Sequence, residues 1–427
     1  MAFVGGPLVG LDIGTSAIRA AQVKTGRGGG AVTAFGQVPL PPDVVVDGEI
    51  RDGEAVAEAI AQLWKRAKFR SKRVVIGIAN QRVVVRQIDL PYLDEKELRD
   101  SLRFQVADHV PMPVEDAELD FEIIEDFQTE GGDHLMRVLL VAAASDMVNG
   151  FVQAASDGGL DPAGVDLTPF AVTRAVSPAA RGEVGAAGAE AVVDVGAGVT
   201  NIVVHEGGRI RFTRTLPNLG GDDFTETIVE QLRVSREDAE RMKRQTSMRL
   251  HPTSPAAASI GHARVKAARA RDTESAEPVA TVSGSPAWGP VVGGNALAGQ
   301  EPASASVAIA VDPAQDEPAG HSSNGDETAR ALEPMVDRLV GEIRGSIEFY
   351  TAQNPTSPLE RIVLTGGGSL IDGLIGRIES SLGLHTEPGH PFERAPIGKI
   401  KVSKHEVTVA EPFMGVAVGL ALAGSGA

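Results

Sequence analysis

Apolar and polar positions near the start of the chain predict two strands joined by a tight turn. Apolar residues run into Asp12, Gly14-Thr15-Ser16 forms the turn, and an alternating pattern continues over residues 18–23. Because glycine has no Cβ and tolerates positive φ, a ligand can approach the backbone at Gly14. The amides and hydroxyls of Thr15 and Ser16 suit phosphate oxygens, and Asp12 suits a hydrated Mg²⁺. An ordinary hairpin fits the same pattern, so a functional interpretation requires matching loops elsewhere.

The stretch 191–204 repeats this design, with an apolar strand, Asp194, a glycine-rich turn and a second apolar strand. Aligning Asp194 with Asp12 places Gly196 on Gly14. An internal repeat of this kind predicts two lobes of like design.

Further elements follow from the spacing of apolar positions. Val/Ile-rich or alternating segments predict strands at 31–38, 73–78, 83–90, 119–125, 136–144 and 361–365. Helical periodicity predicts helices over 53–67 and from Phe413 to Leu422. Two more begin at caps: one runs from the capping box Asp94–Glu97 to Pro111, the other from Asp146 to Gly158. A further helix begins near Leu332, with Pro334 in its first turn.

The apolar pattern disappears over residues 252–325, where Ala, Ser, Pro, Gly and charged residues dominate. Such a segment cannot bury enough surface to offset its ordering entropy, so we expect a disordered insertion, with a transient basic helix over 263–271. A shorter loop of the same kind runs over 177–189. The remaining segments divide into lobe I (8–90 and 145–186), a small extra subdomain (91–144), lobe II (190–250 and 330–405) and a C-terminal helix that returns to lobe I (406–427).

Composition narrows the classes of function. The chain has 427 residues, more than one core usually supports, and a formal net charge of −17, which argues against a broad nucleic-acid-binding surface. The absence of cysteine excludes disulfides, thiol catalysis and Cys-ligated zinc. Because the sequence has no basic N-terminal leader and no apolar run long enough to cross a bilayer, we expect a soluble intracellular protein that reaches a membrane only through a partner.

A third glycine-rich loop, Gly366-Gly367-Gly368-Ser369, follows the predicted strand 361–365. Two lobes that each offer a glycine turn can hold a triphosphate between them, and a loop at a helix start can pass beneath a base and ribose. Three such loops in this order, each preceded by a strand, predict a nucleotide site.

With these loops the chain resembles the superfamily of actin, heat-shock chaperones and sugar kinases and, more narrowly, the PilM family of actin-like proteins of type IV pilus assembly. The motifs that carry the resemblance are those at residues 10–16, 87–91, 110–113, 119–121, 166–171, 194–197, 223–226, 366–369 and 418–421. The subdomain at 91–144 lies where PilM and the division protein FtsA carry an extra subdomain. The resemblance implies an α/β actin-like ATPase fold, with two lobes built on RNase H-like mixed sheets.

The resemblance also implies ATP and Mg²⁺ as ligands and a role for each matching residue. Asp12 and Asp194 would position Mg²⁺ through water. The phosphates would lie against Gly14, Thr15, Ser16 and Arg19 in lobe I and against Asp194, Gly196, Gly198 and Thr200 in lobe II. The ribose and base would contact Glu240 and Lys243, and Gly366, Gly367 and Gly368 would line the adenosine side. Gly221 would also contact the nucleotide.

Two of these assignments have structural alternatives. Glu240 and Lys243 have the i,i+3 spacing of a surface ion pair. The segment Gly220-Gly221-Asp222 also fits a capped helix start.

The sequence departs from actin and the kinases where they place a catalytic polar residue. The corresponding helix reads Thr168-Pro169-Phe170-Ala171, and Ala197 replaces a second acidic residue of actin. Asp166 is the only carboxylate nearby. Since in-line phosphoryl transfer gains from a positioned water or base, we predict slow or no ATP hydrolysis. No catalytic residue is assigned.

PilM proteins bind the short cytoplasmic tail of an inner-membrane PilN protein, so the resemblance implies a PilN-like partner. The groove would be built from lobe I and residues 83–121, and the protein would be cytoplasmic and peripheral to the inner membrane. Contact with the pilus assembly motor complex and self-association are compatible with this assignment, whereas nucleic-acid binding and direct membrane insertion are not expected. The alternatives are an FtsA-like division protein, disfavoured by the lack of a basic amphipathic tail, and a small-molecule kinase.

Overall fold

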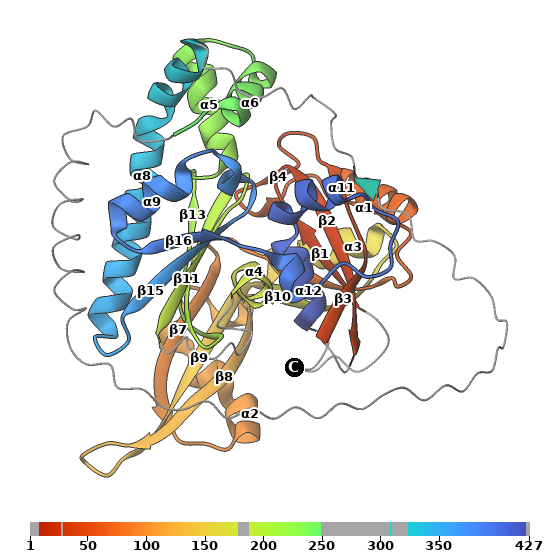
Figure 1. The fold of residues 1–427 in the computed structure, drawn as a ribbon. Helices are drawn as coiled ribbons and strands as arrows, with labels where there is room; N and C mark the ends of the chain where they lie inside the picture. The colour runs from red at the N-terminus through yellow and green to blue at the C-terminus, as the bar shows by residue number, and fades with distance from the viewer. Residues whose placement is uncertain (1–7, 27–28, 178–187, 249–307, 310–322, 424–427) are drawn as a thin grey trace, which may run out of the picture. The chain divides into compact units, whose positions relative to one another are not determined.

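The computed structural model describes residues 8–26, 29–177, 188–248, 308–309 and 323–423 of the chain (Figure 1). The transient helix at 263–271 and most of the two segments predicted to be disordered lie outside these residues. The described part combines two mixed sheets, a small antiparallel sheet and a two-stranded hairpin with the helices that cover them.

The first large sheet contains both strands of the opening hairpin. Its strand order is β10-β6-β1-β2-β3-β14, with β1, β2 and β3 antiparallel and β6 and β10 parallel to β1. The strands are β1 (Val9–Ile13), β2 (Ala17–Gly26), β3 (Gly29–Pro39), β6 (Arg73–Ile78), β10 (Asp161–Leu167) and β14 (Ala308–Ile309). The hairpin β4 (Val45–Val46) and β5 (Glu49–Ile50) follows β3.

Side chains along the strands point alternately to the two faces of this sheet, and both faces are apolar. Helices therefore cover both of them. One face packs with α1 (Gly53–Ala67) and α3 (Ser145–Asp157) in one apolar cluster. The other packs with α4 (Thr168–Val176) and α12 (Gly415–Ala423). The small side chains of α12 let it lie against both α4 and β1.

The second large sheet repeats the first. Its order is β13-β12-β11-β15-β16, so in each sheet an antiparallel meander of three strands is followed by two parallel strands. The strands are β11 (Ala189–Val195), β12 (Val199–Glu206), β13 (Arg209–Pro217), β15 (Leu359–Thr365) and β16 (His385–Pro388). Its core includes α5 (Gly221–Leu232), α6 (Arg236–Gln245), α8 (Ser323–Gln353) and α9 (Leu374–Leu382). The predicted internal repeat is confirmed at the level of strand order.

The small sheet has the order β7-β9-β8 and is antiparallel throughout. Its strands are β7 (Val83–Pro91), β8 (Ala117–Gln128) and β9 (His134–Ala144), and α2 (Glu95–Gln105) packs on it to form a separate core. Both hydrogen bonds of the predicted capping box at Asp94 and Glu97 are present.

The remaining short elements connect these units. They are the 3-10 turns Ala107–His109, Val114–Asp116, Gly367–Leu370 and Glu411–Phe413, together with α10 (Pro391–Arg394) and α11 (Lys404–Ala410). No single helix among the described residues is long and apolar enough to cross a membrane, although the bent pair α11 with its following 3-10 turn and α12 passes that test by length and composition.

Several predicted helix boundaries are wrong. Helix α2 ends at Gln105, well before Pro111, and a 3-10 turn over Ala107–His109 follows it. Pro111 restricts only Val110, which is extended. Asp146 does not cap α3, since the helix begins at Ser145 and the Asp146 carboxylate pairs with Arg82 at 2.5 Å. The final helix begins at Gly415, after the 3-10 turn that contains Phe413.

The disordered insertion predicted over 252–325 extends too far at its C-terminal end. Helix α8 begins at Ser323, so Pro334 lies inside it rather than in its first turn. Thr328 and Ala331 in this upstream part of the helix are buried. Ala308 and Ile309, also predicted to be disordered, pair in parallel with β3.

Candidate functional site

The two predicted glycine turns face each other. In each turn the glycine amide donates to a carbonyl three residues on, from Gly14 to Ala17 at 3.1 Å and from Gly196 to Val199 at 3.0 Å. A Cβ on Gly198 would lie 2.4 Å from the Thr15 hydroxyl oxygen. The structure therefore brings together the turns of the two hairpins, with a glycine required at the point of closest approach.

Two acidic side chains and one arginine lie beside these turns. The Arg19 Nη1 atom is 3.7 Å from the Asp12 Oδ2 atom, and both side chains are largely buried. Burial raises the pKa of Asp12, and the nearby Arg19 partly offsets this. The pKa of Asp194 is raised to about 6, mainly by burial and secondly by the charge of Asp12. The charge of Asp12 therefore disfavours ionisation of Asp194.

This donor set fits Mg²⁺ bound with a phosphate ligand. Mg²⁺ in proteins usually takes one or two carboxylates and completes its shell with water and phosphate oxygens. No group of three or more His, Cys, Asp or Glu residues in the described ranges is arranged to hold a metal alone. Asp12 and Asp194 would thus hold the ion together with the ligand.

Arg19 retains an unsatisfied hydrogen-bond donor. Its Nε atom is buried and has no hydrogen-bond partner, and its guanidinium lies 5.4 Å from the Phe413 ring centroid. A Cβ on Gly14 would be 3.3 Å from the Arg19 Nη1 atom, so the guanidinium lies against the first turn. Since an unpaired buried donor is unfavourable, this position suits an anionic ligand.

The predicted ribose-side residues form one connected group. Lys243 Nζ lies 2.7 Å from a Glu240 carboxylate oxygen, and it donates to the Gly221 carbonyl at 2.8 Å and the Thr225 hydroxyl at 2.7 Å. Burial acts to raise the pKa of Glu240, but Lys243 and Thr225 more than offset it, and the net shift is downward. The ion pair expected at i,i+3 is present, yet Lys243 is largely buried rather than on the surface.

Gly221 also begins helix α5, as the alternative interpretation proposed. The Gly220 amide donates to the Asp223 carboxylate at 2.7 Å. The Gly221 amide donates to the Gly196 carbonyl at 2.8 Å, which joins this helix start to the second turn. Gly221 therefore lies at a capped helix start and also next to the predicted nucleotide site.

The third glycine loop packs directly on the strand that ends at the second turn. Gly366 has φ +82°, and a Cβ there would be 2.6 Å from the Asp194 Oδ1 atom. A Cβ on Gly368 would be 2.2 Å from the Val195 side chain. Packing alone requires these two glycines, so contact with adenosine stays a prediction. Gly367 instead lies beside Phe413.

Two predicted phosphate residues differ in accessibility. Thr200 is fully buried, and its hydroxyl donates to the Leu219 carbonyl at 2.6 Å. Ser16 is exposed at the first turn. A phosphate contact by either residue stays a prediction.

The one carboxylate considered for catalysis is engaged elsewhere. Asp166 accepts hydrogen bonds from Arg174 at 3.1 Å and from the Leu167 amide at 2.7 Å. Arg174 also donates to the Gly419 carbonyl at 2.7 Å, which holds the pair against α12. Asp166 is therefore committed to a structural ion pair.

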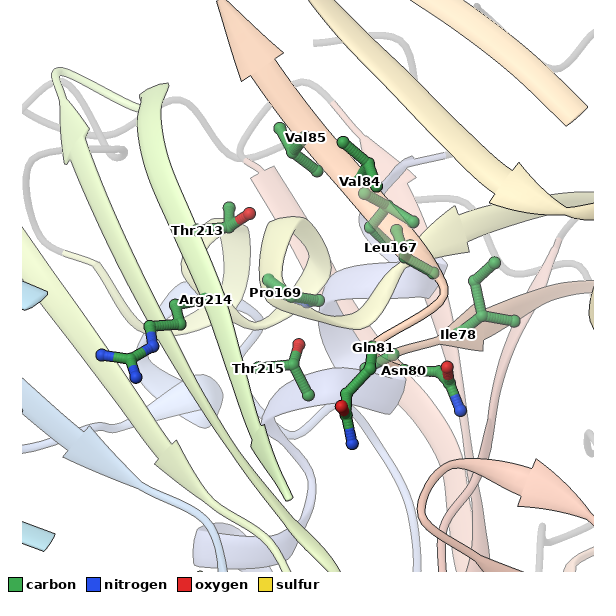
Figure 2. Close-up of a pocket in the computed structure, with 12 residues that line it drawn as sticks. Ile78, Asn80, Gln81, Val84, Val85, Leu167, Pro169, Thr213, Arg214 and Thr215 are labelled. Carbon is green, nitrogen blue, oxygen red and sulfur yellow. The ribbon is translucent and has the colours of Figure 1, made fainter. Parts of the chain in front are cut away.

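A cavity of about 270 Å³ lies between the small sheet and the second large sheet (Figure 2). Its lining comes from the end of β6 and the loop after it, the start of β7, the end of β10, the start of α4 and the edge strand β13. The lining residues are Ile78, Ala79, Asn80, Gln81, Val83, Val84, Val85, Leu167, Pro169, Thr213, Arg214 and Thr215. The predicted nucleotide-binding residues do not line it. Sequence reasoning missed its β13 side, because the pattern of residues 209–217 did not identify that strand.

The cavity lies where two strand edges approach each other. β7 and β13 are edge strands of their sheets, and the Gln87 side chain donates to the Arg211 carbonyl at 3.4 Å between them. Figure 2 shows Arg214 pointing away from β7. Its guanidinium instead bonds Ser346 at 3.2 Å and Glu342 at 2.8 Å on α8.

Comparison with known families identifies the chain. The family model described as type IV pilus assembly protein PilM matches residues 10–252. The chain belongs to the PilM family. The predicted family and the predicted actin-like fold are thereby confirmed. The model described as cell division protein FtsA also matches, over residues 191–419, which relates the second lobe of this PilM-family chain to FtsA.

Individual relatives agree with this assignment. A solved PilM-PilN type IV pilus biogenesis complex is 25% identical, with a TM-score of 0.70 and coverage of 98% of this chain and 99% of that one. Cell division protein FtsA of Bacillus subtilis (strain 168) is 24% identical over 259 residues, which are 56% of this chain and 57% of that protein. The match to FtsA thus spans little more than half of its length.

Proposed function

We propose that this PilM-family protein is a nucleotide-binding scaffold of type IV pilus assembly that holds the tail of a PilN-like inner-membrane protein. The observation that carries the nucleotide part is the meeting of the two glycine turns beside Asp12, Asp194 and Arg19. Bound Mg²⁺ would neutralise the negative charges of Asp12 and Asp194, and a polyphosphate oxygen would accept a hydrogen bond from the unpaired Arg19 Nε.

The proposed ligand is ATP with Mg²⁺. The bound ion would supply charge neutralisation of the phosphates, with Asp12 and Asp194 facing it. The buried Lys243 and its partner Glu240 offer a cation and a carboxylate to a ribose and base on the lobe II side. Gly366 lies against Asp194 and Gly368 against Val195, which supports an adenosine position next to the phosphates.

Hydrolysis is slow or absent. Helix α4 begins with Thr168 and Pro169 and offers no free carboxylate, and Asp166 is held by Arg174. A positioned water or base is therefore not available from this helix. ATP would then act mainly by holding the two lobes together rather than by turnover.

The partner tail is proposed to enter the cavity between β7 and β13. An extended peptide can add to an exposed strand edge through main-chain hydrogen bonds, with pockets for alternate side chains. Val84 and Val85 supply apolar surface, and Thr213 lies across from them. The partner in the solved complex is PilN, which supports a PilN-like tail here and a position peripheral to the inner membrane.

The cavity can be tested without disturbing the fold. Thr213→Trp would fill it, whereas Thr351→Trp places the same side chain on the exposed surface of α8, away from the residues that line the cavity. The measurement is fluorescence anisotropy with a synthetic peptide of the N-terminal tail of a PilN-like protein. We expect Thr213→Trp to weaken binding by about tenfold or more, as for a blocked central pocket, and Thr351→Trp to change it little. Equal binding by both variants contradicts the site.

A further inference from the structure

Phe413 lies between the two halves of the proposed nucleotide site. It belongs to the 3-10 turn Glu411–Phe413, which precedes α12. One side of its ring lies near the Arg19 guanidinium, at 5.4 Å from the ring centroid. Another ring edge meets the third glycine loop, since a Cβ on Gly367 would be 3.0 Å from the Phe413 Cε1 atom.

The Phe413 ring is one of two restraints on the Arg19 head group. The other is the long ion pair with Asp12, 3.7 Å from Nη1 to Oδ2, while the Nε atom has no hydrogen-bond partner. An aromatic face attracts a guanidinium through its quadrupole and limits where the plane can turn. The guanidinium is thereby kept against the Gly14 turn.

We infer that Phe413 is a positioning residue that aims Arg19 at the phosphates and so favours a polyphosphate over an uncharged nucleoside. This inference rests on the proposed nucleotide site and adds a residue outside its three glycine loops. Because the same ring touches Gly367, the position of Arg19 is tied to the loop proposed to lie beside adenosine.

The test compares ATP with adenosine on the full chain. Phe413→Leu keeps an apolar side chain but removes the aromatic face, and Phe413→Tyr keeps the face. Affinity for ATP with Mg²⁺ is measured by calorimetry, and affinity for adenosine by ligand-observed NMR. We expect Phe413→Leu to weaken ATP about threefold to tenfold and leave adenosine unchanged, with Phe413→Tyr close to wild type. Equal melting temperatures would show that folding is intact.

A double-mutant cycle separates positioning from general packing. Once Arg19→Gln has removed the cation, Phe413→Leu should cause no further loss of ATP affinity. Equal losses for ATP and adenosine, or additive losses with Arg19→Gln, would overturn the role of Phe413 alone. Wild-type protein that binds neither ATP nor adenosine would overturn the nucleotide site and this inference together.

Discussion

Thr15 and Gly198 meet across the two lobes: a side-chain carbon on Gly198 would lie 2.4 Å from the Thr15 hydroxyl oxygen. The two hairpins come from distant parts of the sequence, yet each turn is closed by the same glycine amide hydrogen bond. This contact sets how closely the lobes approach at the proposed phosphate position. A side chain at residue 198 would therefore act as a wedge.

Gly198→Ala should separate the turns and weaken nucleotide binding. A contact this short requires a shift, and rotation of the Thr15 side chain gives little relief because its Cβ and Cγ2 atoms would also lie only 3.2 and 3.3 Å from the new carbon. A displacement of this size at a charged ligand site is expected to cost roughly tenfold or more in ATP affinity, measured by calorimetry.

Two further variants give this prediction its controls. Gly341→Ala adds the same carbon to α8, where a Cβ meets open space, and should leave ATP binding unchanged. Thr15→Ala in the Gly198→Ala background removes the clashing hydroxyl and should restore part of the affinity. Unaltered ATP binding by Gly198→Ala would show that the turns do not enclose the ligand.

Asp194→Asn should stabilise the ligand-free protein at neutral pH. The folded-state pKa of Asp194 is raised from 3.8 to about 6, so ionisation is harder in the folded chain than in the unfolded one. Stability is consequently lost as pH rises from about 4 through 6. At pH 7.5 the amide variant should be more stable by roughly 1–3 kcal/mol, and the difference should shrink as pH falls toward 4.

Urea unfolding at pH 7.5 and at pH 4.5 measures this difference. Glu58→Gln makes a comparable carboxylate-to-amide change on the exposed surface of α1 and should alter stability by less than about 0.5 kcal/mol. The same Asp194→Asn variant should bind ATP more weakly with Mg²⁺ present. A variant that is less stable than wild type at pH 7.5 would argue against repulsion between Asp12 and Asp194.

Local pattern was sufficient to predict the two hairpins and their pairing into two lobes. Each hairpin joins strands that are adjacent in sequence, so alternation and a glycine turn specify it. The repeat of Asp12 at Asp194 then predicted two sheets of like design, and the strand orders agree. The early end of α2 was not predicted, because buried Val106 and Val110 continue an apolar stripe after the helix has ended.

The cavity and the role of Phe413 depend on contacts between distant segments. Thr213 on β13 lies opposite Val84 on β7 only after both sheets have formed. Phe413 was assigned to a helix, and nothing in its neighbourhood in the sequence relates it to Arg19. Phe104 on α2 is 86% exposed, although it is a large apolar residue. Periodicity specifies which face of an element is apolar, but not which distant segment will cover it.

Asp166→Asn should leave ATP turnover unchanged. The Asp166 carboxylate is held by Arg174, so it is not placed to accept a proton from water or a substrate hydroxyl. Wild-type and variant proteins should both release phosphate at less than about 0.01 per second, in the range of unassisted nucleotide hydrolysis. Turnover of several per second by the wild type, abolished by the variant, would favour a small-molecule kinase instead.

The buried His205 should make the second lobe sensitive to acid. Burial, opposed by the charge of Glu190 and assisted by Arg361, lowers the folded-state pKa of His205 from 6.5 to about 4. Between these values the unfolded chain binds a proton that the folded chain excludes, so stability is present above pH 6.5 and is lost as pH falls toward 4. The neutral ring accepts a hydrogen bond from the Gly208 amide through Nδ1 at 3.2 Å.

His205→Asn keeps an acceptor for Gly208 but cannot take up a proton in this pH range. We expect urea unfolding between pH 7 and 4.5 to show a loss of stability in the wild type that exceeds the loss in the variant by roughly 2–3 kcal/mol. The carboxylates titrate in both proteins, so the difference between the two slopes of stability against pH isolates the histidine. His405→Asn, on the exposed surface of α11, should retain the wild-type slope. If His205→Asn and wild type lose stability in parallel, His205 is protonated in the folded state and its burial does not exclude the charge.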